Sequence, residues 1–189
     1  MSPIARLVKW ALATYFRLQG WSVEGQAPAS RKFVVIAAPH TSNWDFVYFI
    51  GAADALHLNL SFMGKASLFR WPFAGIMRDL GGVPIDRSQS RDTVSVMAEE
   101  FSRRDEFMLT IAPEGTRGKA RQWKTGFYNI ALKAGVPMVC GMMDYRRKVV
   151  SLGEAIMASG DYEKDMVKLA AIYQSCSPKY PERATTFQG

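Results

Sequence analysis

The stretch APHTSNWDF, residues 38–46, places His40 five residues before Asp45. On one continuous helix the two side chains would point about 140° apart, because each residue turns the helix by about 100°. If the chain instead leaves a strand at Pro39 and enters a helix near Ser42, the imidazole can fold back onto a carboxylate in the first helical turn. A neutral imidazole oriented by a carboxylate is a general base, since the carboxylate fixes its tautomer and stabilises the imidazolium as it forms.

The same residues also have a purely structural interpretation. Ser42 and Asp45 have the spacing of a capping box, so they could cap a helix while His40 fills a polar pocket. Capping and catalysis are compatible. The chain has no GxSxG nucleophile motif, so the proton that His40 would remove belongs to a substrate hydroxyl or amine. The other histidine, His57, is expected at a helix end, and no metal site is predicted.

A second stretch, APEGTRGK at residues 112–119, carries groups suited to an anion. Gly115 permits a tight turn with exposed backbone N–H groups, Thr116 offers a hydroxyl, and Arg117 offers a planar fork that matches a phosphate. The alternative is a surface turn with solvated charges, which is the more common outcome for an arbitrary tetrapeptide. The prediction of an anion cradle therefore depends on other cations lying nearby.

These residues need a scaffold that brings separate segments together. Apolar runs alternate with amphipathic segments, which predicts a single α/β domain with a largely parallel or mixed sheet flanked by helices. We expect strands at residues 33–38, 58–63, 83–85, 107–112, 136–145 and 148–153, and helices at 43–56, 67–82, 91–104, 124–134 and 161–175. Pro84 predicts an edge position for its strand, because proline has no backbone N–H to donate to a neighbouring strand.

Four of the expected strands end next to polar or charged residues. His40, Lys65, Arg87 and the segment 114–117 each follow a strand. Functional groups in such sheets gather beyond the carboxyl ends of the strands, so these four ends are predicted to form one site. Lys65 and Arg87 could each be a solvated charge, and it is their joint occurrence that favours a site.

Composition narrows the class of partner. A chain of 189 residues with 48% hydrophobic content suits one domain with a sizeable core. The 24 Lys and Arg against 17 Asp and Glu give a net charge of +7, which favours polyanions, anionic headgroups or phosphorylated substrates. Nucleic acid is not expected, because no nucleic-acid-binding motif accompanies the charge. Cys140 and Cys176 lack the spacing of a zinc or redox pair, so free thiols are predicted.

Residues 1–22 are predicted to form an amphipathic helix. Its apolar stripe consists of Ile4, Leu7, Val8, Ala11, Leu12 and Tyr15, and its basic side of Arg6, Lys9 and Arg17. Most amphipathic helices pack on their own domain. Basic residues opposite an apolar stripe that is flanked by Trp10 and Trp21 are also typical of a helix lying in a membrane surface. No uncharged apolar run approaches the roughly 20 residues that cross a bilayer, so we expect peripheral attachment.

The motifs, in this order, resemble those of the glycerophospholipid (lysophospholipid) acyltransferase family, whose best-known members are 1-acyl-sn-glycerol-3-phosphate acyltransferases. The catalytic motif of that family, His and Asp separated by four residues, matches His40 and Asp45. Its other motifs resemble GGVPIDR at 81–87, PEGTR at 113–117 and GVPMV at 135–139. The resemblance covers roughly residues 33–142. The chain departs from the family at Pro39, Ala112 and Gly118, where Asn, Phe and Ser are usual, and none of these changes removes a reactive group.

The resemblance implies a glycerol-3-phosphate acyltransferase-like fold over residues 23–189, behind a membrane-surface helix at 1–22. The implied reaction moves a fatty acyl group from acyl-CoA or acyl-carrier protein to the hydroxyl of a lysophospholipid. The first candidate acceptor is 1-acyl-sn-glycerol-3-phosphate, which would give phosphatidic acid. No metal or other cofactor is implied. The enzyme would sit on the cytoplasmic face of a membrane that contains anionic lipids.

The resemblance also implies roles for the site residues. His40 would be the catalytic base and Asp45 its orienting carboxylate. The substrate-binding set would be Lys65, Arg87, Glu114, Gly115, Thr116 and Arg117, with Arg117 the firmest phosphate contact.

Three other interpretations remain open at this point. The chain could acylate a different lipid acceptor. It could be a phosphate-ester hydrolase, which would need paired carboxylates for a metal or a phosphorylatable nucleophile that the sequence does not place. It could also be a non-catalytic membrane-surface adaptor that works through its basic N-terminal helix.

Overall fold

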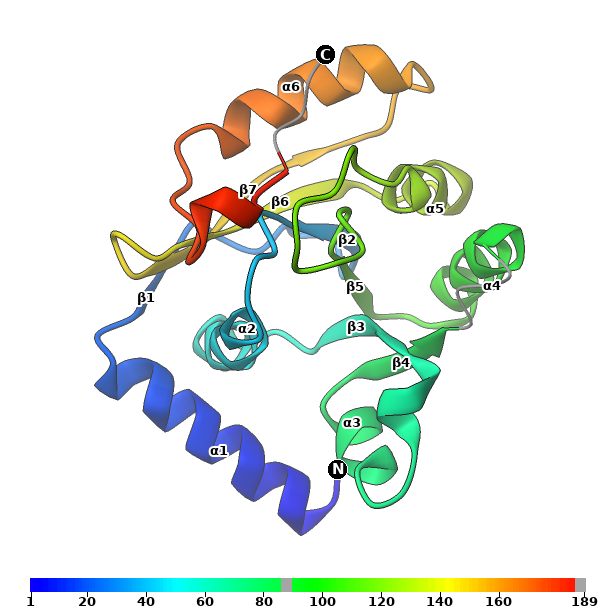
Figure 1. The fold of residues 1–189 in the computed structure, drawn as a ribbon. Helices are drawn as coiled ribbons and strands as arrows, with labels where there is room; N and C mark the ends of the chain where they lie inside the picture. Colours follow the sequence, from blue (N-terminus) through cyan, green and yellow to red (C-terminus); the bar gives the residue numbers. More distant parts are fainter. Residues whose placement is uncertain (86–89, 186–189) are drawn as a thin grey trace.

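The centre of the fold is a seven-stranded mixed sheet with the spatial order β1-β7-β6-β2-β5-β3-β4 (Figure 1). The computed structural model describes residues 1–85 and 90–185. The strands are β1 (Ser22–Glu24), β2 (Lys32–Ala37), β3 (Leu60–Lys65), β4 (Gly82–Ile85), β5 (Phe107–Ile111), β6 (Met138–Asp144) and β7 (Val149–Ile156). Neighbouring strands are parallel except β6 and β7, which are antiparallel. The predicted α/β fold with a mixed sheet is confirmed, and β4 with Pro84 lies at the edge as predicted.

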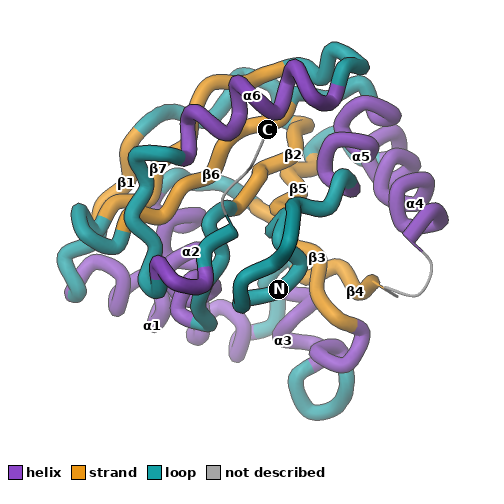
Figure 2. The backbone as a smooth tube through the Cα atoms, turned by 45° about the horizontal axis from the view of Figure 1, so that its top comes forward, coloured by secondary structure: helices purple, strands orange, loops and turns teal. Residues whose placement is uncertain are grey.

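Helices cover both faces of the sheet. They are α1 (Pro3–Leu18), α2 (Trp44–Ala55), α3 (Ala74–Asp79), α4 (Ser90–Arg103), α5 (Gly126–Ala134) and α6 (Tyr162–Tyr173), with short 3₁₀ turns η1 (Ala66–Phe69) and η2 (Pro181–Arg183). One face is covered by α4, α5 and α6, and the other by α2, with α1 outside α2 (Figures 1 and 2). The sheet, α2 and α1 therefore form three successive layers.

Alternate side chains of β2 serve two separate cores. Val34 and Ile36 pack with residues of α4, α5 and α6, whereas Phe33 and Val35 pack on the other face with Ala53 of α2. This is the period of two that a pleated strand imposes. Because both faces of β2 are covered, the strand is held firmly, and the chain that leaves its carboxyl end starts from a fixed position.

The predicted helix at residues 67–82 is wrong in its first half. The chain forms η1, then a turn through Arg70–Phe73, and only then the short helix α3. Pro72 explains the break, because proline has no N–H for a helical hydrogen bond and its ring clashes with the preceding turn. The interruption leaves Trp71 and Phe73 on an exposed turn.

The inner side of α1 packs on α2 through small side chains and one aromatic ring. Ala5, Ala13 and Phe16 are buried there, and α1 and α2 are extensively in contact. Phe16 lies against Gly51 of α2, where a Cβ atom would collide with the phenylalanine side chain. The close approach of the two helices therefore requires glycine at this position.

The opposite side of α1 leaves apolar side chains in solvent. Ile4, Leu7, Trp10 and Leu18 are 62%, 64%, 63% and 79% exposed. Of the remaining stripe members, Ala11 is exposed and Val8, Leu12 and Tyr15 are half-buried. A helix that only completed the core would bury these side chains. No helix in residues 1–85 or 90–185 is both long and apolar enough to span a bilayer.

The basic side chains of α1 divide between the domain and the solvent. Lys9 and Arg17 both reach Asp54 of α2, at 3.9 and 2.8 Å. Arg6 is exposed and has no carboxylate within 4.0 Å among the residues that the structure describes. Two of the three basic residues therefore help to fix α1 on α2.

Candidate active site

His40 and Asp45 form a direct contact at the carboxyl end of β2. The His40 Nδ1 atom lies 3.1 Å from Asp45 Oδ2, and the two side chains are 25% and 8% exposed. The chain leaves β2 after Ala37, passes through His40 outside any helix, and enters α2 at Trp44, so Asp45 lies in the first helical turn. The predicted folding of the imidazole onto this carboxylate is present.

The Asp45 carboxylate is held by three donors besides His40. Its Oδ2 atom accepts the backbone N–H groups of Thr41 at 2.9 Å and Ser42 at 3.0 Å, and its Oδ1 atom accepts the Tyr145 hydroxyl at 2.5 Å. The capping-box interpretation is therefore half right. Asp45 binds the backbone N–H of Ser42, but the Ser42 hydroxyl accepts from Trp44 N at 3.1 Å and not from the backbone of Asp45.

This network determines which nitrogen of His40 is available for chemistry. An ionised carboxylate can only accept hydrogen bonds, so the contact with Asp45 assigns the proton of a neutral imidazole to Nδ1. The lone pair then lies on Nε2. Within the residues that the structure describes, Nε2 takes part in none of the hydrogen bonds of His40, and a partly exposed ring with this lone pair available has the arrangement of a general base.

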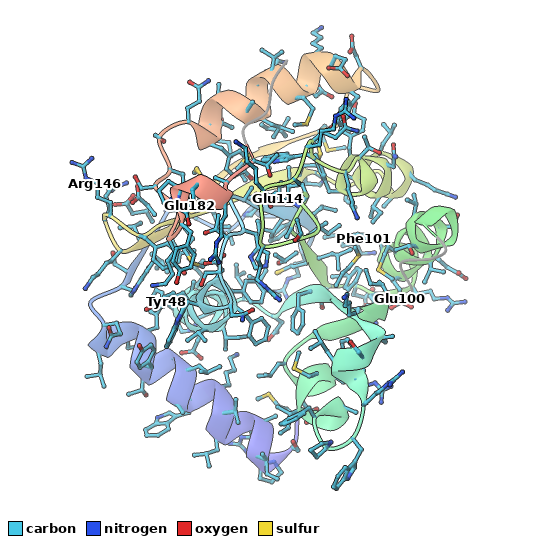
Figure 3. The ribbon with its side chains drawn as sticks, in the orientation of Figure 1. Tyr48, Glu100, Phe101, Glu114, Arg146 and Glu182 are labelled. Atoms are coloured by element: carbon cyan, nitrogen blue, oxygen red, sulfur yellow. The ribbon has the colours of Figure 1, made fainter. Side chains whose placement is uncertain are left out.

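Glu114 joins the end of β5 to the end of β2. Its Oε1 atom accepts the backbone N–H of His40 at 3.0 Å, and the residue is 3% exposed (Figure 3). The second carboxylate oxygen, Oε2, is buried without a hydrogen-bond partner in the described part of the chain. Burial raises the pKa of Glu114, and the hydrogen bond from His40 N–H opposes this rise only in part. Glu114 therefore braces the histidine loop from a neighbouring strand.

Tyr145 is a site residue that the sequence analysis missed. It lies in the turn between β6 and β7, and its ring packs edge-on against Trp21 and Tyr48, with centroids 5.0 and 5.7 Å apart. Burial, and then the hydrogen bond to Asp45, raise the pKa of Tyr145, so its hydroxyl stays protonated and remains a donor. No local signal could have found this contact, because Asp45 and Tyr145 are 100 residues apart.

The aromatic contacts of Tyr145 connect the site to the N-terminal helix. Trp21, just after α1, stacks on Tyr48 of α2 at 4.2 Å between ring centroids. In Figure 3, Tyr48 lies on the side of α2 that faces α1. The same ring cluster therefore touches α1, α2 and the residue that holds Asp45.

The loop after β5 makes a tight turn in which the Gly115 N–H donates to Ala112 O at 3.1 Å, and its role as an anion cradle stays a prediction. Gly115 has φ of +65°, and a Cβ atom there would lie 3.0 Å from Lys124 Cε and Nζ, so both conformation and space require glycine. The Lys124 N–H donates to Pro113 O at 2.9 Å and closes the loop. Thr116 and Arg117 are exposed beyond this closure. The closure brings the Lys124 ammonium, which the sequence analysis did not single out, next to Gly115.

The remaining predicted cations lie partly within the described chain. Lys65 is exposed at the carboxyl end of β3, which is parallel to β5, so its strand end lies on the same edge as that of β5. Arg87 lies outside the described residues. In the parts of the chain that are described, Lys65, Arg117 and Lys124 have no carboxylate within 4.0 Å, and no hydrogen bond joins them to His40. Their charges are available to an anion.

Two cavities lie at the opposite edge of the sheet. One of about 550 Å³ lies between the ends of α4 and α5 and the amino ends of β2 and β6. A smaller one of about 360 Å³ is lined by Arg31, His57 and Glu106, among others. His57 therefore faces away from the carboxyl edge that holds His40, and neither cavity belongs to the candidate site.

A family model described as Acyltransferase matches residues 21–143. The chain belongs to this acyltransferase family. The match includes His40, Asp45, Glu114 and Arg117, whereas α1 and Tyr145 lie outside it.

Curated relatives carry related names. The chain is 27% identical to the 1-acyl-sn-glycerol-3-phosphate acyltransferase of Haemophilus influenzae, over 91% of this chain and 78% of that protein. It is 32% identical to the Salmonella typhimurium protein of the same name, over 65% of this chain and 52% of that protein. It is 29% identical to the lyso-ornithine lipid O-acyltransferase of Pseudomonas aeruginosa, over 82% and 60%. The chain thus spans about half the length of the Salmonella relative.

A solved structure shares the fold of this acyltransferase. The crystal structure of the 1-acyl-sn-glycerophosphate (LPA) acyltransferase PlsC from Thermotoga maritima aligns with a TM-score of 0.58 at 20% sequence identity. The alignment covers 91% of this chain and 80% of the other. The two proteins therefore share a fold over the aligned part.

Proposed function

We propose that this acyltransferase moves a fatty acyl group from a thioester donor, acyl-CoA or acyl-carrier protein, to the hydroxyl of a lysophospholipid. The first candidate acceptor is 1-acyl-sn-glycerol-3-phosphate, and the product is then phosphatidic acid. Membership of the family and the names of the Haemophilus and Salmonella relatives support this proposal. The observation that carries it is the contact of 3.1 Å between His40 Nδ1 and Asp45 Oδ2, at a sheet edge that also presents unpaired cations.

The proposed reaction begins with His40 acting as a base. As the acceptor hydroxyl attacks the thioester carbonyl carbon, Nε2 takes the hydroxyl proton, and Asp45 stabilises the imidazolium that forms. A tetrahedral intermediate results, with negative charge on the former carbonyl oxygen. Its collapse breaks the carbon–sulfur bond, and the imidazolium returns the proton to the departing thiolate. The products are the acyl ester and the free thiol, and His40 is neutral again.

The acceptor phosphate is assigned to the cations of the same edge. Arg117 and Lys124 flank the cradle at Gly115, and Lys65 reaches from the end of the neighbouring strand β3. Arg87 remains a further candidate on its sequence motif alone. The Thr116 hydroxyl completes the set of donors, whereas the N–H groups of Gly115 and Gly118 already donate to Ala112 O and Thr116 Oγ1.

Glu114 has two proposed tasks, one for each oxygen. Its Oε1 atom fixes the backbone of His40. Its Oε2 atom, buried and without a hydrogen-bond partner among the described residues, is the proposed acceptor for a hydroxyl of the bound lipid, which requires the loop to open onto this atom.

We further propose that residues 1–22 form a membrane-surface helix attached to an acyltransferase domain at 23–189. The exposed apolar side of α1 supports this, since a bilayer is the environment that would cover it. The net charge of +7 favours a surface with anionic lipids. The proposed thioester donors are cytoplasmic molecules, and we therefore propose that the enzyme acts at the cytoplasmic face.

Lyso-ornithine lipid is a second candidate acceptor, because the Pseudomonas relative named for it aligns over 82% of this chain. An ornithine headgroup has no phosphate. Only the phosphate-bearing acceptor should therefore depend on the cation cluster of Lys65, Arg117 and Lys124, which allows the two candidates to be separated by experiment.

The decisive experiment incubates the purified full chain with labelled acyl-CoA or acyl-carrier protein and a panel of lysolipids with and without phosphate. We expect a new diacyl product with the phosphate-bearing acceptor and none with His40→Ala. Phosphate release without an acyl donor would favour a hydrolase. Vesicle binding without consumption of thioester would favour an adaptor and contradict the proposal.

A further inference from the structure

The turn between η1 and α3 exposes a dense group of large apolar side chains. Leu68, Trp71 and Phe73 are 48%, 92% and 63% exposed. Single apolar residues on a surface are ordinary, but several close together mark a surface that something else covers. Trp71 has almost no cover from its own domain, so its side chain contributes little to the fold.

The helix that follows this turn, α3, is tied to the start of α1. The Ser2 N–H donates to Asp79 Oδ2 at 2.8 Å, and the N-terminal ammonium lies 3.8 Å from Asp79 Oδ1 at the end of α3. The hydrogen bonds from Ser2 lower the pKa of Asp79, so the carboxylate stays ionised in this contact. In Figure 1, α1 and the segment from η1 to α3 lie along the same side of the molecule, away from α4, α5 and α6.

We infer that the turn through Leu68–Phe73 is a second bilayer-contact point, which acts together with α1. We define the lipid platform as the exposed side chains Ile4, Leu7, Trp10, Leu18, Leu68, Trp71 and Phe73. The inference rests on the proposed membrane role of α1 and adds an independent point of insertion to it. Two points fix the tilt of a protein on a surface, whereas one helix alone leaves the protein free to roll about the helix axis.

Charge identifies the occupant of the platform as a bilayer with anionic headgroups. Arg6, Arg70 and Arg78 are exposed around it and have no carboxylate within 4.0 Å in residues 1–85 and 90–185. Tryptophan favours the interface between headgroups and acyl chains, where guanidinium groups meet phosphates. A second copy of the chain on this face would bring like charges together, which disfavours it.

The platform also has a consequence for the site. Lys65 immediately precedes η1 at the carboxyl end of β3, so η1 alone separates this candidate phosphate contact from the turn at Arg70–Phe73. A lipid acceptor that remains in the bilayer next to the turn would reach the cation cluster from the β3 side.

The test compares Trp71→Ser/Phe73→Ser with the full wild-type chain on vesicles of phosphatidylglycerol and phosphatidylcholine. We expect the double variant to partition about tenfold more weakly, because two aromatic side chains no longer leave water. Val167→Ser on α6 is the matched control, since Val167 is 63% exposed on another helix and should not affect binding. Unchanged melting temperatures confirm that both variants fold.

A second readout reports on Trp71 directly. Vesicles with brominated phosphatidylcholine should quench the tryptophan fluorescence of the wild type more than that of Trp71→Phe. Equal quenching, or wild-type partitioning of the double variant, would overturn the inference. A shift from dimer to monomer in the double variant with unchanged vesicle binding would also overturn it, in favour of a second copy.

A third measurement separates this inference from the proposed function. Acyl transfer is assayed without vesicles, on a short-chain lysolipid that is monomeric in solution. A wild type that transfers acyl groups but does not bind vesicles overturns the platform and leaves the proposed activity intact. A wild type that binds vesicles through Trp71 but transfers nothing supports the platform and contradicts the activity.

Discussion

The loops that follow β2 and β5 lie at the same edge of the sheet, but they are built differently. In the loop after β2, Thr41 and Ser42 are buried, and their N–H groups are both bound to Asp45. In the loop after β5, residues 116–119 are exposed. The loop is held at its base by Glu114 and by the Lys124 N–H, and at its far end by the Ala120 N–H, which donates to Thr185 Oγ1 at 2.9 Å.

The difference corresponds to what each loop is proposed to do. A base must be held in place, because a misplacement of about 1 Å costs on the order of 100-fold in rate. A cation that holds a phosphate acts over a longer range and tolerates movement. Changes in the loop after β2 should therefore appear in kcat, and changes in the loop after β5 should appear in the KM of the acceptor.

The largest effect is expected for His40→Ala. Loss of the base should reduce kcat by roughly 10²- to 10⁴-fold, and the fold should be retained because the ring is partly exposed. Steady-state kinetics and a melting curve check this. Wild-type turnover in the folded variant would remove His40 from the mechanism.

A smaller effect, of a different kind, is expected for Arg117→Ala. The KM for a phosphate-bearing acceptor should rise about tenfold with little change in kcat, because one charge-assisted contact is lost. Lys124→Ala should act in the same direction. Lys164→Ala, an exposed cation on α6, is the matched control. A lower kcat with unchanged KM would contradict the division between the two loops.

Tyr145→Phe tests whether the hydrogen bond that Asp45 accepts from outside its own loop contributes to catalysis. The variant keeps the ring contacts with Trp21 and Tyr48 and removes only the donor to Asp45 Oδ1. We expect kcat to fall roughly tenfold at unchanged acceptor KM, because the carboxylate orients the imidazole less well. A control is Tyr162→Phe, a half-buried tyrosine on α6. Equal kinetics in both variants would limit Tyr145 to packing.

The smallest effect concerns stability and pH. Burial raises the pKa of Glu114, so its protonation favours the folded state, and this contribution is lost as the pH rises through the raised pKa. Glu114→Gln has no such titration. The melting temperature of the variant relative to wild type should therefore increase between about pH 4 and about pH 8. Any effect of the new amide that does not depend on pH cancels when the two pH values are compared. A difference in melting temperature that stays constant with pH would contradict the raised pKa of Glu114.

Local patterns determined how much of this could be predicted from the sequence. The strands at β2 and β5 followed from runs of apolar residues, and the contact between His40 and Asp45 followed from their spacing across one turn. Three-residue β1 is too short to give a periodic signal, and the helix expected at 67–82 is shorter because Pro72 interrupts it. Tyr145 and Lys124 come close to the site only when the chain folds. The spacing of residues along the sequence therefore does not predict them.

One consequence of Gly51 reaches beyond the packing of two helices. Because Gly51 has no side chain, Phe16 packs directly against α2, the helix whose first turn carries Asp45. In the proposed membrane-bound state, the depth at which α1 enters the lipid would therefore set how far the His40–Asp45 pair lies from the bilayer. The hydrogen atom that Gly51 carries in place of a methyl group thus keeps α1 close against the helix that carries Asp45.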